Sequence, residues 1–576
     1  MDIAAGTNLK NESEMKKYFF YLSTLALLAA ACNKIDNNST PIEEEPAPAV
    51  QMITETVSGS RGVETKATIS NTGASFKWNE GDNVAVHVSK DGTHKYVTTT
   101  KGADAAAASA NFEVTYEEGY SRDAFAVYPS TIVAENAANY GQSGHSLDVT
   151  LPDSYTLAQV QGEVSPCPMI ATNAAGAGWN FYQLCGLLRL TVNSIPPSTK
   201  RLEIDFNGNK VWGDFSIAQT ITPGTSDIKT ATGSENDVIK IFKEGPTVDV
   251  TLNNNAWLDG LALNIPLPTG DYTSITVTAY SALSGGDAVL VPVTLPFGYT
   301  ASNLYGTKRT ASFLVFSVSA DKRVLFSPGN LQATTTDLGA NWTWHFAEHQ
   351  YDYIGKAVAN DQIDGDGSVA KNGTVDLFQK STTAYTTYGI SNSGSYDDLY
   401  NGTFKDWGTI DIDGKGANYW RTLTVGNHET NYEWSYLLLS RNTGVEVNET
   451  NDARYTLAQI NTDSTPVNGL IIFPNYFVGG DFAGVTWGTI NAASAWGTKC
   501  TTAGWESLAA AGCVFLPITG RRSNSKGSFY DLDKGYYFGN SSDGARVMDF
   551  RENKAVSISN NISYSGCAVR LVHEVQ

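Results

Sequence analysis

From about residue 50 onward, the chain alternates apolar and polar residues with a period of two. Leu188, Leu190 and Val192 alternate with Arg189 and Thr191. The same alternation recurs at residues 202–206, 248–252 and 275–279. Successive side chains of a β-strand point to opposite faces, so each run predicts a strand with one face in a core and the other in solvent. Breaks rich in Gly, Asn and Pro separate the runs at intervals of about ten residues, as in β-sandwiches. We therefore expect a mainly β protein.

A secretory signal precedes these strands. Met15 and two lysines at 16 and 17 are followed by an apolar run at 18–28 and by three alanines at 29–31, directly before Cys32. This is the order of a signal peptide and its cleavage site. The apolar run is shorter than the roughly 20 residues that a membrane-spanning helix needs. We therefore expect residues 1–31 to be a leader and signal peptide, with Met15 as the initiator.

The end of this signal resembles the lipobox of bacterial lipoproteins. In a lipobox the cysteine after the small residues is acylated and becomes the new N-terminus. Ala29 stands where the lipobox usually has leucine. The resemblance implies that Cys32 is lipidated, and the alternative is an ordinary signal peptide with an incidental cysteine.

The composition sets limits on location and partners. The net charge of −20 argues against nucleic acid as a partner, because nucleic-acid binding needs basic patches. Charged residues make up only 17% of the chain, which is typical of an exported β protein rather than a cytosolic helical enzyme. Past the signal, no apolar run is long enough for a membrane helix, so we expect attachment through lipid. Residues 32–50 are polar, acidic and rich in proline, which predicts a solvated tether.

Five cysteines remain after Cys32, and they are Cys167, Cys185, Cys500, Cys513 and Cys567. An odd number cannot all pair within one chain. None belongs to a CxxC motif, so a zinc site based on cysteine spacing is not expected. Export permits disulfides. Cys167 with Cys185 and Cys513 with Cys567 are possible pairs, and buried thiols are equally compatible with the sequence.

A series of short motifs in the first half of the chain resembles the fimbrillin-like proteins of Bacteroidetes, the type V pilins and their accessory subunits. The motifs are ETKATI at 64–69, FKWNEGDNVAVHV at 76–88, FAVYP at 125–129 and LCGLLRLTV at 184–192. The resemblance covers about 260 residues. It implies two tandem transthyretin-like β-sandwich domains, which we place at 51–195 and 196–310.

Aromatic residues become frequent after Phe313, and the motifs change. They include FSVSADKRVLFSPGNLQ at 316–332, WTWHFAEHQYDYIG at 342–355, GWESLAAAGCVFLPITGRR at 504–522 and GCAVRLV at 566–572. Residues 313–576 resemble a C-terminal module of Bacteroidetes and Fibrobacter surface proteins. That module is thought to share the α+β fold of C-type lectins and of the formylglycine-generating enzyme. Helical spacing predicts two short helices, near 434–438 and 505–509.

Two motifs in this module carry metal-binding residue types. HFAEH at 345–349 matches the HxxEH pattern of zinc peptidases, which requires a helix. The alternation of Trp342, Trp344 and Phe346 predicts a strand instead, so we do not expect a zinc site. DQIDGDGS at 361–368 brings Asp361, Asp364 and Asp366 together as a calcium loop would, although Asn372 stands where an EF-hand has its bidentate glutamate. A polar surface turn is the alternative.

Other signatures of chemistry are missing from the sequence. The EPN, QPD and WND motifs of calcium-dependent lectins are absent, and the cysteines do not reproduce the reactive pair of the formylglycine-generating enzyme. We therefore expect no enzymatic activity and no cofactor, with calcium at Asp361, Asp364 and Asp366 as the alternative. Aromatic residues in loop-rich sequence could stack on sugars or anchor a protein, or they could fill the core. They are Trp407, Tyr419, Trp420, Trp487, Trp496, Tyr536 and Tyr537.

The fimbrillin resemblance implies a function. In that family, a protease specific for Arg or Lys removes an N-terminal segment, and a strand from a neighbouring subunit fills the groove by β-augmentation. SGSRGVETKATI at 58–69 offers Arg61 and Lys66 as cleavage sites. The C-terminus lies in a separate module, so this chain would accept a strand without donating one, as suits a pilus tip.

The expected function is therefore a pilus-associated adhesin at the cell surface, as an outer-membrane lipoprotein or in the fimbrium. Other pilin subunits would be its partners, together with a host or microbial protein or glycan. The alternatives are a lipid-anchored glycan-binding lipoprotein outside any pilus and an enzyme of the formylglycine-generating fold.

The lipobox predicts the effect of one substitution. Cys32→Ser removes the acylated thiol, so lipid attachment and delivery to the surface should be lost. Membrane fractionation of cells expressing the variant measures this. Membrane association equal to that of the wild type would contradict the lipoprotein prediction.

Overall fold

The computed structural model is mainly β, as the period-two pattern predicts. It describes residues 51–61, 78, 80–102, 109–132, 147–161, 167–172, 178–217, 230–232, 238–242, 257–268, 270–301, 306–383, 387–393, 402–426, 432–462, 465–492, 495–541, 545–561 and 564–575. Cys32, Lys66 and the alternating run at 248–252 lie outside these residues. Within the described ranges, no helix is long and apolar enough to cross a bilayer.

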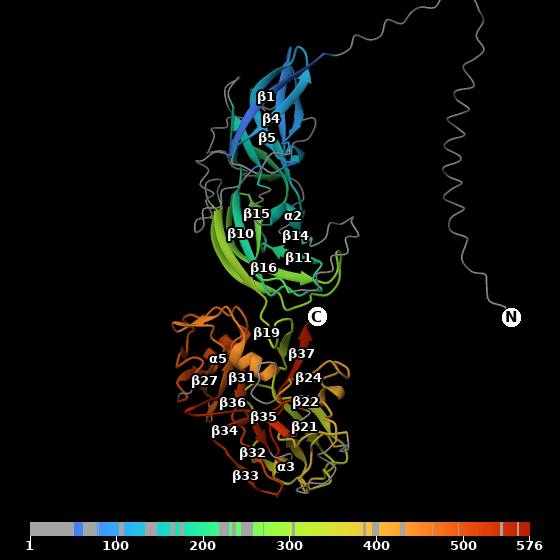
Figure 1. Ribbon diagram of the computed structural model, residues 1–576, viewed down its shortest axis with the longest axis vertical. Helices are drawn as coiled ribbons and strands as arrows, with labels where there is room; N and C mark the ends of the chain where they lie inside the picture. Colours follow the sequence, from blue (N-terminus) through green and yellow to red (C-terminus); the bar gives the residue numbers. More distant parts are fainter. Residues whose placement is uncertain are drawn as a thin grey trace, which may run out of the picture. The chain divides into compact units, whose positions relative to one another are not determined.

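The first sheet has seven strands in the order β3-β2-β5-β8-β9-β1-β4. Figure 1 labels three of them, β1, β4 and β5. They are β1 (Met52–Arg61), β2 (Asn83–Lys90), β3 (Thr93–Thr100), β4 (Ser109–Glu117), β5 (Ser121–Tyr128), β8 (Met169–Thr172) and β9 (Trp179–Gln183), with a 3-10 turn η1 (Ser130–Ile132) after β5. Asp91 and Gly92 join β2 to β3 with φ of 48° and 79°, the left-handed conformation that a two-residue hairpin loop requires.

Trp78 lies at the centre of the core that this sheet encloses. Its ring packs edge-on against Phe112, Tyr128 and Phe181, with ring centroids 5.1, 5.2 and 5.2 Å apart. Edge-to-face pairs add to the free energy gained by burying the rings. The FKWNEGD motif therefore supplies the main core residue of the first sheet.

A second core is built around β10 (Gly186–Asn193), which pairs antiparallel with β15 (Leu261–Leu267) and parallel with β18 (Gly306–Ser312). A second sheet has the order β17-β16-β11-β14-β7. Its strands are β7 (Ser154–Thr156), β11 (Arg201–Asp205), β14 (Val238–Phe242), β16 (Gly270–Tyr280) and β17 (Val293–Ala301). A smaller sheet holds β6 (Leu147–Leu151), β12 (Gly213–Ile217) and β13 (Thr230–Thr232), and α2 (Leu157–Val160) follows β7.

The alternation read from the sequence corresponds to this core. Leu188, Leu190 and Val192 are buried, and Arg189 and Thr191 between them are half-buried. The predicted boundary between residues 195 and 196 places β10 in the first domain. Among the described residues, however, β10 pairs only with β15 and β18, and both of these strands lie beyond that boundary. The segment 147–161 likewise contributes strands to sheets of the second core. Strands from before the predicted boundary thus hydrogen-bond with strands from after it. Such pairing between distant segments cannot be predicted from the local pattern of the sequence.

Residues from 316 onward form several small sheets and short helices. The main strands are β19 (Phe316–Ser317), β20 (Arg323–Phe326), β21 (Leu331–Thr335), β22 (Thr343–Phe346), β23 (Gly373–Val375), β24 (Arg421–Thr422), β27 (Tyr455–Asn461), β28 (Pro466–Ile472), β30 (Thr498–Thr501), β31 (Val514–Pro517), β34 (Lys534–Phe538), β35 (Ala545–Arg551), β36 (Lys554–Asn561) and β37 (Leu571–Val575). Two-residue strands are β25 (Glu446–Val447), β26 (Thr450–Asn451), β29 (Val485–Thr486), β32 (Arg521–Arg522) and β33 (Phe529–Tyr530). The helical segments are α3 (Val358–Asp361), η2 (Trp407–Thr409), α4 (Glu433–Ser435), η3 (Tyr436–Ser440) and α5 (Thr502–Ala510).

Both predicted helices are present in this region, as α4 with η3 and as α5. The final strand, β37, lies between β20 and β24, so the last residues of the region are paired with its first ones. The GCAVRLV motif enters β37 only at Leu571, and Cys567 and Val569 are buried immediately before this strand.

Buried charged groups fix the loops of this region. Arg441 is fully buried, and its guanidinium donates to the carbonyl oxygens of Leu437 and Phe473 and to the side chain of Asn475. Asp376 is also fully buried; its carboxylate accepts from the Ile354 amide at 2.7 Å and from the Asn360 side-chain amide at 2.5 Å. Burial raises the pKa of Asp376 to about 6, against the hydrogen bonds that lower it.

This pKa predicts a pH-dependent stability. Because the folded-state pKa lies above the ordinary value of 3.8, the folded protein binds a proton more tightly than the unfolded chain does. The stabilising contribution is full below about pH 4 and is lost as the pH rises through about 6. Relative to Asp376→Asn, the wild type should lose up to about 3 kcal/mol of unfolding free energy between about pH 4 and about pH 7.

Urea denaturation of both proteins across this pH range measures the difference. Asp481→Asn is the control, because it removes a carboxylate at an exposed position of the same region. A constant difference between wild type and Asp376→Asn over the whole range would contradict the prediction.

Candidate functional site

The strand β1 is the first described element of the chain, yet it occupies an interior place in its sheet. It lies between β9 and β4. It runs parallel to β9, with Gly59, Ser60 and Arg61 opposite Trp179, Asn180 and Phe181. Val57 is buried in the core that also holds Trp78. A strand in such a place can leave only by breaking hydrogen bonds on both of its edges.

A polar contact fixes β1 from the neighbouring strands β4 and β5. The Glu55 carboxylate accepts from the Tyr116 hydroxyl at 3.1 Å and from Arg122 Nε at 2.8 Å. Arg122 is largely buried and lies over the Trp179 ring at 5.5 Å. Burial, and then the charge of Glu55, raises the pKa of the Tyr116 phenol, so its proton remains available for the hydrogen bond. Glu55 and Val57 therefore anchor the same face of β1.

Of the two candidate cleavage residues, Arg61 is the last residue of β1, and Lys66 lies outside the described residues. Cleavage after Arg61 would separate the whole of β1 from the rest of the chain. Residue type alone identifies Arg61 in the sequence, whereas Glu55, Tyr116 and Arg122 were not predicted. The signal for Glu55 was its place two residues before Val57, which puts an acidic residue on the buried face of a strand.

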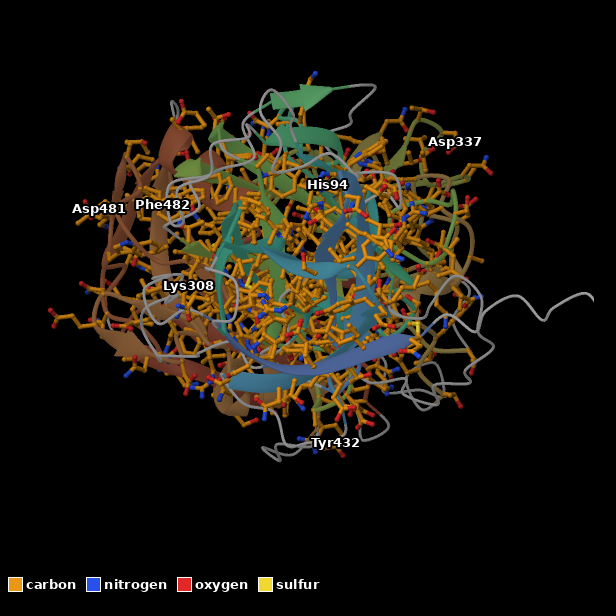
Figure 2. The ribbon with its side chains drawn as sticks, turned by 90° about the horizontal axis from the view of Figure 1, so that it is seen from above. His94, Lys308, Asp337, Tyr432, Asp481 and Phe482 are labelled. Carbon is orange, nitrogen blue, oxygen red and sulfur yellow. The ribbon has the colours of Figure 1, made fainter. Side chains whose placement is uncertain are left out.

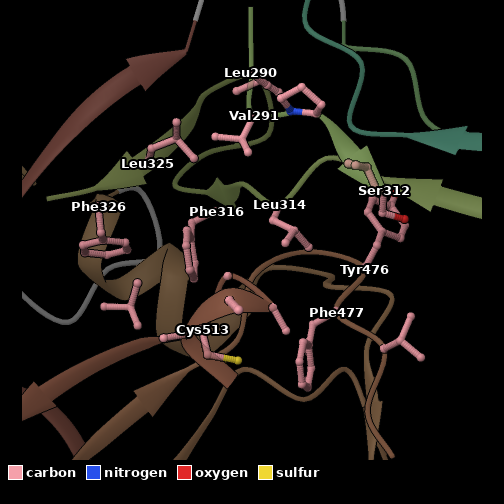
Figure 3. Close-up of a pocket in the computed structure, with 18 of the residues that line it drawn as sticks. Leu290, Val291, Ser312, Leu314, Phe316, Leu325, Phe326, Tyr476, Phe477 and Cys513 are labelled. Atoms are coloured by element: carbon pink, nitrogen blue, oxygen red, sulfur yellow. The ribbon is translucent and has the colours of Figure 1, made fainter. Parts of the chain in front are cut away.

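A second feature is an apolar pocket of about 610 Å³ (Figure 3). Its walls come from β17, from Leu314 and Phe316, and from the segments around Phe477 and Cys513. Figure 2 shows Phe482, another wall residue, inward of its exposed neighbour Asp481. Val291 and Val478 are each 79% exposed at this pocket. Such a pocket can hold an apolar group.

The cysteine in this pocket is poorly suited to catalysis. Cys513 is 1% exposed, and burial raises the pKa of its thiol well above the usual range. Burial likewise raises the pKa of Cys500 to about 12. Nucleophilic cysteines act as thiolates, which these environments disfavour.

The three aspartates of the predicted calcium loop have separate protein partners. Asp364 pairs with Lys526 at 2.5 Å, and Asp366 accepts from the amide and hydroxyl of Ser368. The Asp361 carboxylate accepts from Gln362 at 3.0 Å. Among the described residues, no group of three or more His, Cys, Asp or Glu side chains is arranged to hold a metal ion.

The HFAEH segment contains a strand, as the alternation predicts. His345 lies in β22, where its Nε2 is 2.8 Å from the Thr334 hydroxyl. His349 lies beyond the strand and pairs with Asp352 at 3.1 Å. The two histidines thus have different partners, and the helix that a zinc peptidase requires is not formed.

Most of the singled-out aromatic residues fill the core. Trp407, Trp496, Tyr536 and Tyr537 are buried, and Trp420 and Trp487 are half-buried. Tyr419 is the exception at 37% exposed, and its ring stacks flat on His573 with centroids 4.0 Å apart.

Comparisons with known proteins give distant matches. No family model matches the chain, and no curated protein is similar to it. A solved structure of a suggested cell adhesion protein from Bacteroides uniformis is 14% identical, covers 39% of this chain and 79% of its own, and has a TM-score of 0.22. A fimbrial assembly protein from Parabacteroides distasonis is 12% identical, with coverages of 48% and 95% and a TM-score of 0.24. The C-terminally truncated tip fimbrial protein Mfa3 from Porphyromonas gingivalis is 12% identical, with coverages of 42% and 82% and a TM-score of 0.19. TM-scores this low support no conclusion about the fold.

The contacts of Glu55 predict how firmly β1 is held. Glu55→Gln keeps the size of the side chain but removes the charge that strengthens the bond from Arg122. We expect amide hydrogen exchange in β1 to become about tenfold faster, as a loss of about 1.4 kcal/mol in local stability implies.

Hydrogen exchange read by mass spectrometry on the β1 peptide measures this rate. Glu80→Gln, at an exposed position before β2, is the matched control and should leave the rate unchanged. Equal exchange in wild type and Glu55→Gln would show that Glu55 does not anchor β1.

Proposed function

We propose that this chain is a pilus-associated surface adhesin subunit, activated by cleavage after Arg61. The cleavage releases β1, and a strand from another subunit takes its place between β9 and β4. The observation that carries this proposal is the position of β1, an N-terminal strand that is flanked on both edges and ends at a cleavable arginine.

The energetics favour refilling the vacated place. Removal of β1 would leave two strand edges unpaired, and unpaired edges readily bind another strand. A strand of five or six residues restores several backbone hydrogen bonds, each contributing about 1 kcal/mol net. An apolar residue in the place of Val57 adds roughly 1.5 to 3 kcal/mol through burial. These gains should exceed the cost of ordering the incoming strand.

The C-terminus supports a role as acceptor rather than donor. β37 is paired with β20 on one edge and with β24 on the other, and Leu571 and Val572 are buried. A strand held in this way is not available for donation to a neighbouring subunit. A subunit that accepts a strand without donating one ends a polymer, and the proposal therefore assigns this chain to the pilus tip.

The finer fold assignments belong to the same proposal. We assign transthyretin-like sandwiches to the first two cores and a C-type-lectin-like fold to residues 313–576. The separate cores and the pairing of the first and last strands of the third region support these assignments. The third region would then be the binding head, without catalysis, as the buried protonated thiols favour.

One observation favours a second candidate function, a lipid-anchored glycan-binding lipoprotein outside any pilus. The Tyr419 ring is exposed and held flat against His573, as a platform for a sugar ring would be. The mature N-terminus distinguishes the two functions. A lipidated Cys32 favours the anchored lipoprotein, and an N-terminus directly after Arg61 or Lys66 favours the pilus subunit.

The proposal predicts the outcome of limited proteolysis and of two substitutions. Low-dose trypsin should cut the precursor once, after Arg61 or Lys66, because Arg61 is the last residue of β1 and a cut there falls at the end of the strand. The remaining body should stay intact, as read by mass spectrometry. In cells, Arg61→Ala combined with Lys66→Ala should reduce incorporation into pili at least tenfold, since β1 would stay in place.

Lys210→Ala removes an exposed cation elsewhere and should leave incorporation unchanged. Incorporation of the double variant at the wild-type level, measured by quantitative immunoblotting of isolated pili, would exclude proteolytic activation at this site.

A further inference from the structure

Two buried cysteines meet where the first sheet continues into the second core. Cys167 lies two residues before β8, and Cys185 lies between β9 and β10. Their Sγ atoms are 3.1 Å apart. The side chains are 1% and 0% exposed. The sequence left this pair as one of two possible pairings.

The backbone geometry explains why these sulfurs meet. β8 and β9 form an antiparallel hairpin, and the Leu184 amide donates to the Pro168 carbonyl at 2.8 Å at the open end of this hairpin. Cys167 and Cys185 are the next residues outward on the two chains. Residues that face each other across neighbouring strands have the short Cβ separation that a disulfide needs.

We propose that Cys167 and Cys185 form a disulfide in the mature exported protein. Both are thiols in the structure. A disulfide has an S–S length of about 2.05 Å, so the sulfurs, now 3.1 Å apart, need to approach by only about 1 Å. The proposal rests on export to an oxidising compartment and not on a role in a pilus.

The oxidant is a disulfide of an extracytoplasmic thiol–disulfide oxidant, either a protein or a small molecule. One cysteine loses its proton and attacks this disulfide, which forms a mixed disulfide and releases one thiolate. The second cysteine loses its proton, attacks the first sulfur and displaces the other thiolate. The two cysteines together lose two protons and two electrons, and the oxidant is reduced to two thiols.

The surroundings decide when this exchange can occur. Tyr155 and Tyr272 are buried near the sulfurs; burial, and then the neighbouring Cys185, raises the pKa of both phenols. Both tyrosines belong to the second core. Because this environment excludes solvent, the exchange must take place before the second core closes. Once formed, the bond is protected from reductants by the same burial.

The disulfide would hold the hairpin that carries β9, the parallel partner of β1. If β1 leaves as proposed above, β9 loses the partner on one edge and keeps its covalent tie at the end next to β10. The acceptor site would then remain formed until a new strand arrives. This consequence depends on the proposed function, whereas the disulfide itself does not.

Peptide mapping of the full chain isolated from cells tests the proposal. The protein is denatured without reductant, alkylated with iodoacetamide and digested. The peptides of Cys167 and Cys185 should be joined, and each should become alkylated only after dithiothreitol treatment. Alkylation of both cysteines without reductant would overturn the proposal. In that case a second sample is refolded with oxidised glutathione. A disulfide in this sample would show that the geometry permits the bond and that the premise of export to an oxidising compartment is wrong. No disulfide would show that the geometry does not permit the bond.

Stability provides an independent readout. Cys167 and Cys185 lie 18 positions apart in the sequence, so reduction should raise the unfolding equilibrium constant of the first two cores about a hundredfold. The double variant Cys167→Ser, Cys185→Ser should show no effect of dithiothreitol on its unfolding midpoint in urea. Cys500→Ser, which alters a buried cysteine of the third region, should retain the effect. An equal effect of dithiothreitol in the double variant would contradict the proposal.

Discussion

The pairing of β10 on both of its edges is the constraint on which the rest of the structure depends. β10 takes β15 from residues 261–267 as its antiparallel partner and β18 from residues 306–312 as its parallel partner. Its side chains at Leu188, Leu190 and Val192 are fully buried. A central strand buried in this way fixes its register strongly, because a slip by one residue would turn the apolar side chains to the opposite face.

The segments before and after this core connect it to the first sheet and to the third region. β9 precedes it by two residues, so the first sheet and the second core share one continuous segment that contains Cys185. β18 ends at Ser312 and leads directly to Phe313 and Val315, which are buried with the second core. The Arg323 guanidinium pairs with Asp259 at 2.7 Å and lies over the Trp257 ring. The residues at the start of the third region therefore pack in the second core or form an ion pair with it.

The ends of the described chain are held in different ways. β1 depends on edge hydrogen bonds, on the buried Val57 and on the contacts of Glu55. β37 follows the buried Arg570, whose guanidinium donates to Gln350 at 2.8 Å and approaches Asn330 at 3.5 Å. These two contacts fix the residue that precedes β37, although the buried Arg570 Nε has no hydrogen-bond partner among the described residues. The two ends thus differ in the way that the proposed release of β1 and the proposed retention of β37 require.

Much of the local structure follows from residue order alone. Period two predicted the buried strands β10, β11 and β16, and helical spacing predicted α5. The alternation of Trp342, Trp344 and Phe346 correctly favoured a strand over the zinc-binding helix that the HFAEH motif suggests. These predictions succeed because strand and helix periodicity depends on neighbouring residues. The leader, Cys32 and Lys66 rest on sequence motifs, and they remain predictions.

Contacts between distant residues could not be read in this way. The sequence placed three aspartates within six positions. In the folded chain, Asp364 forms an ion pair with Lys526 and Asp366 accepts a hydrogen bond from Ser368. It offered two cysteine pairings, and only the β8–β9 hairpin brings Cys167 to Cys185. Residue order determined which segments become strands and which face each buries. The tertiary structure alone decided which strands lie side by side, because a strand can pair with any edge of matching register and only burial of the whole core selects one.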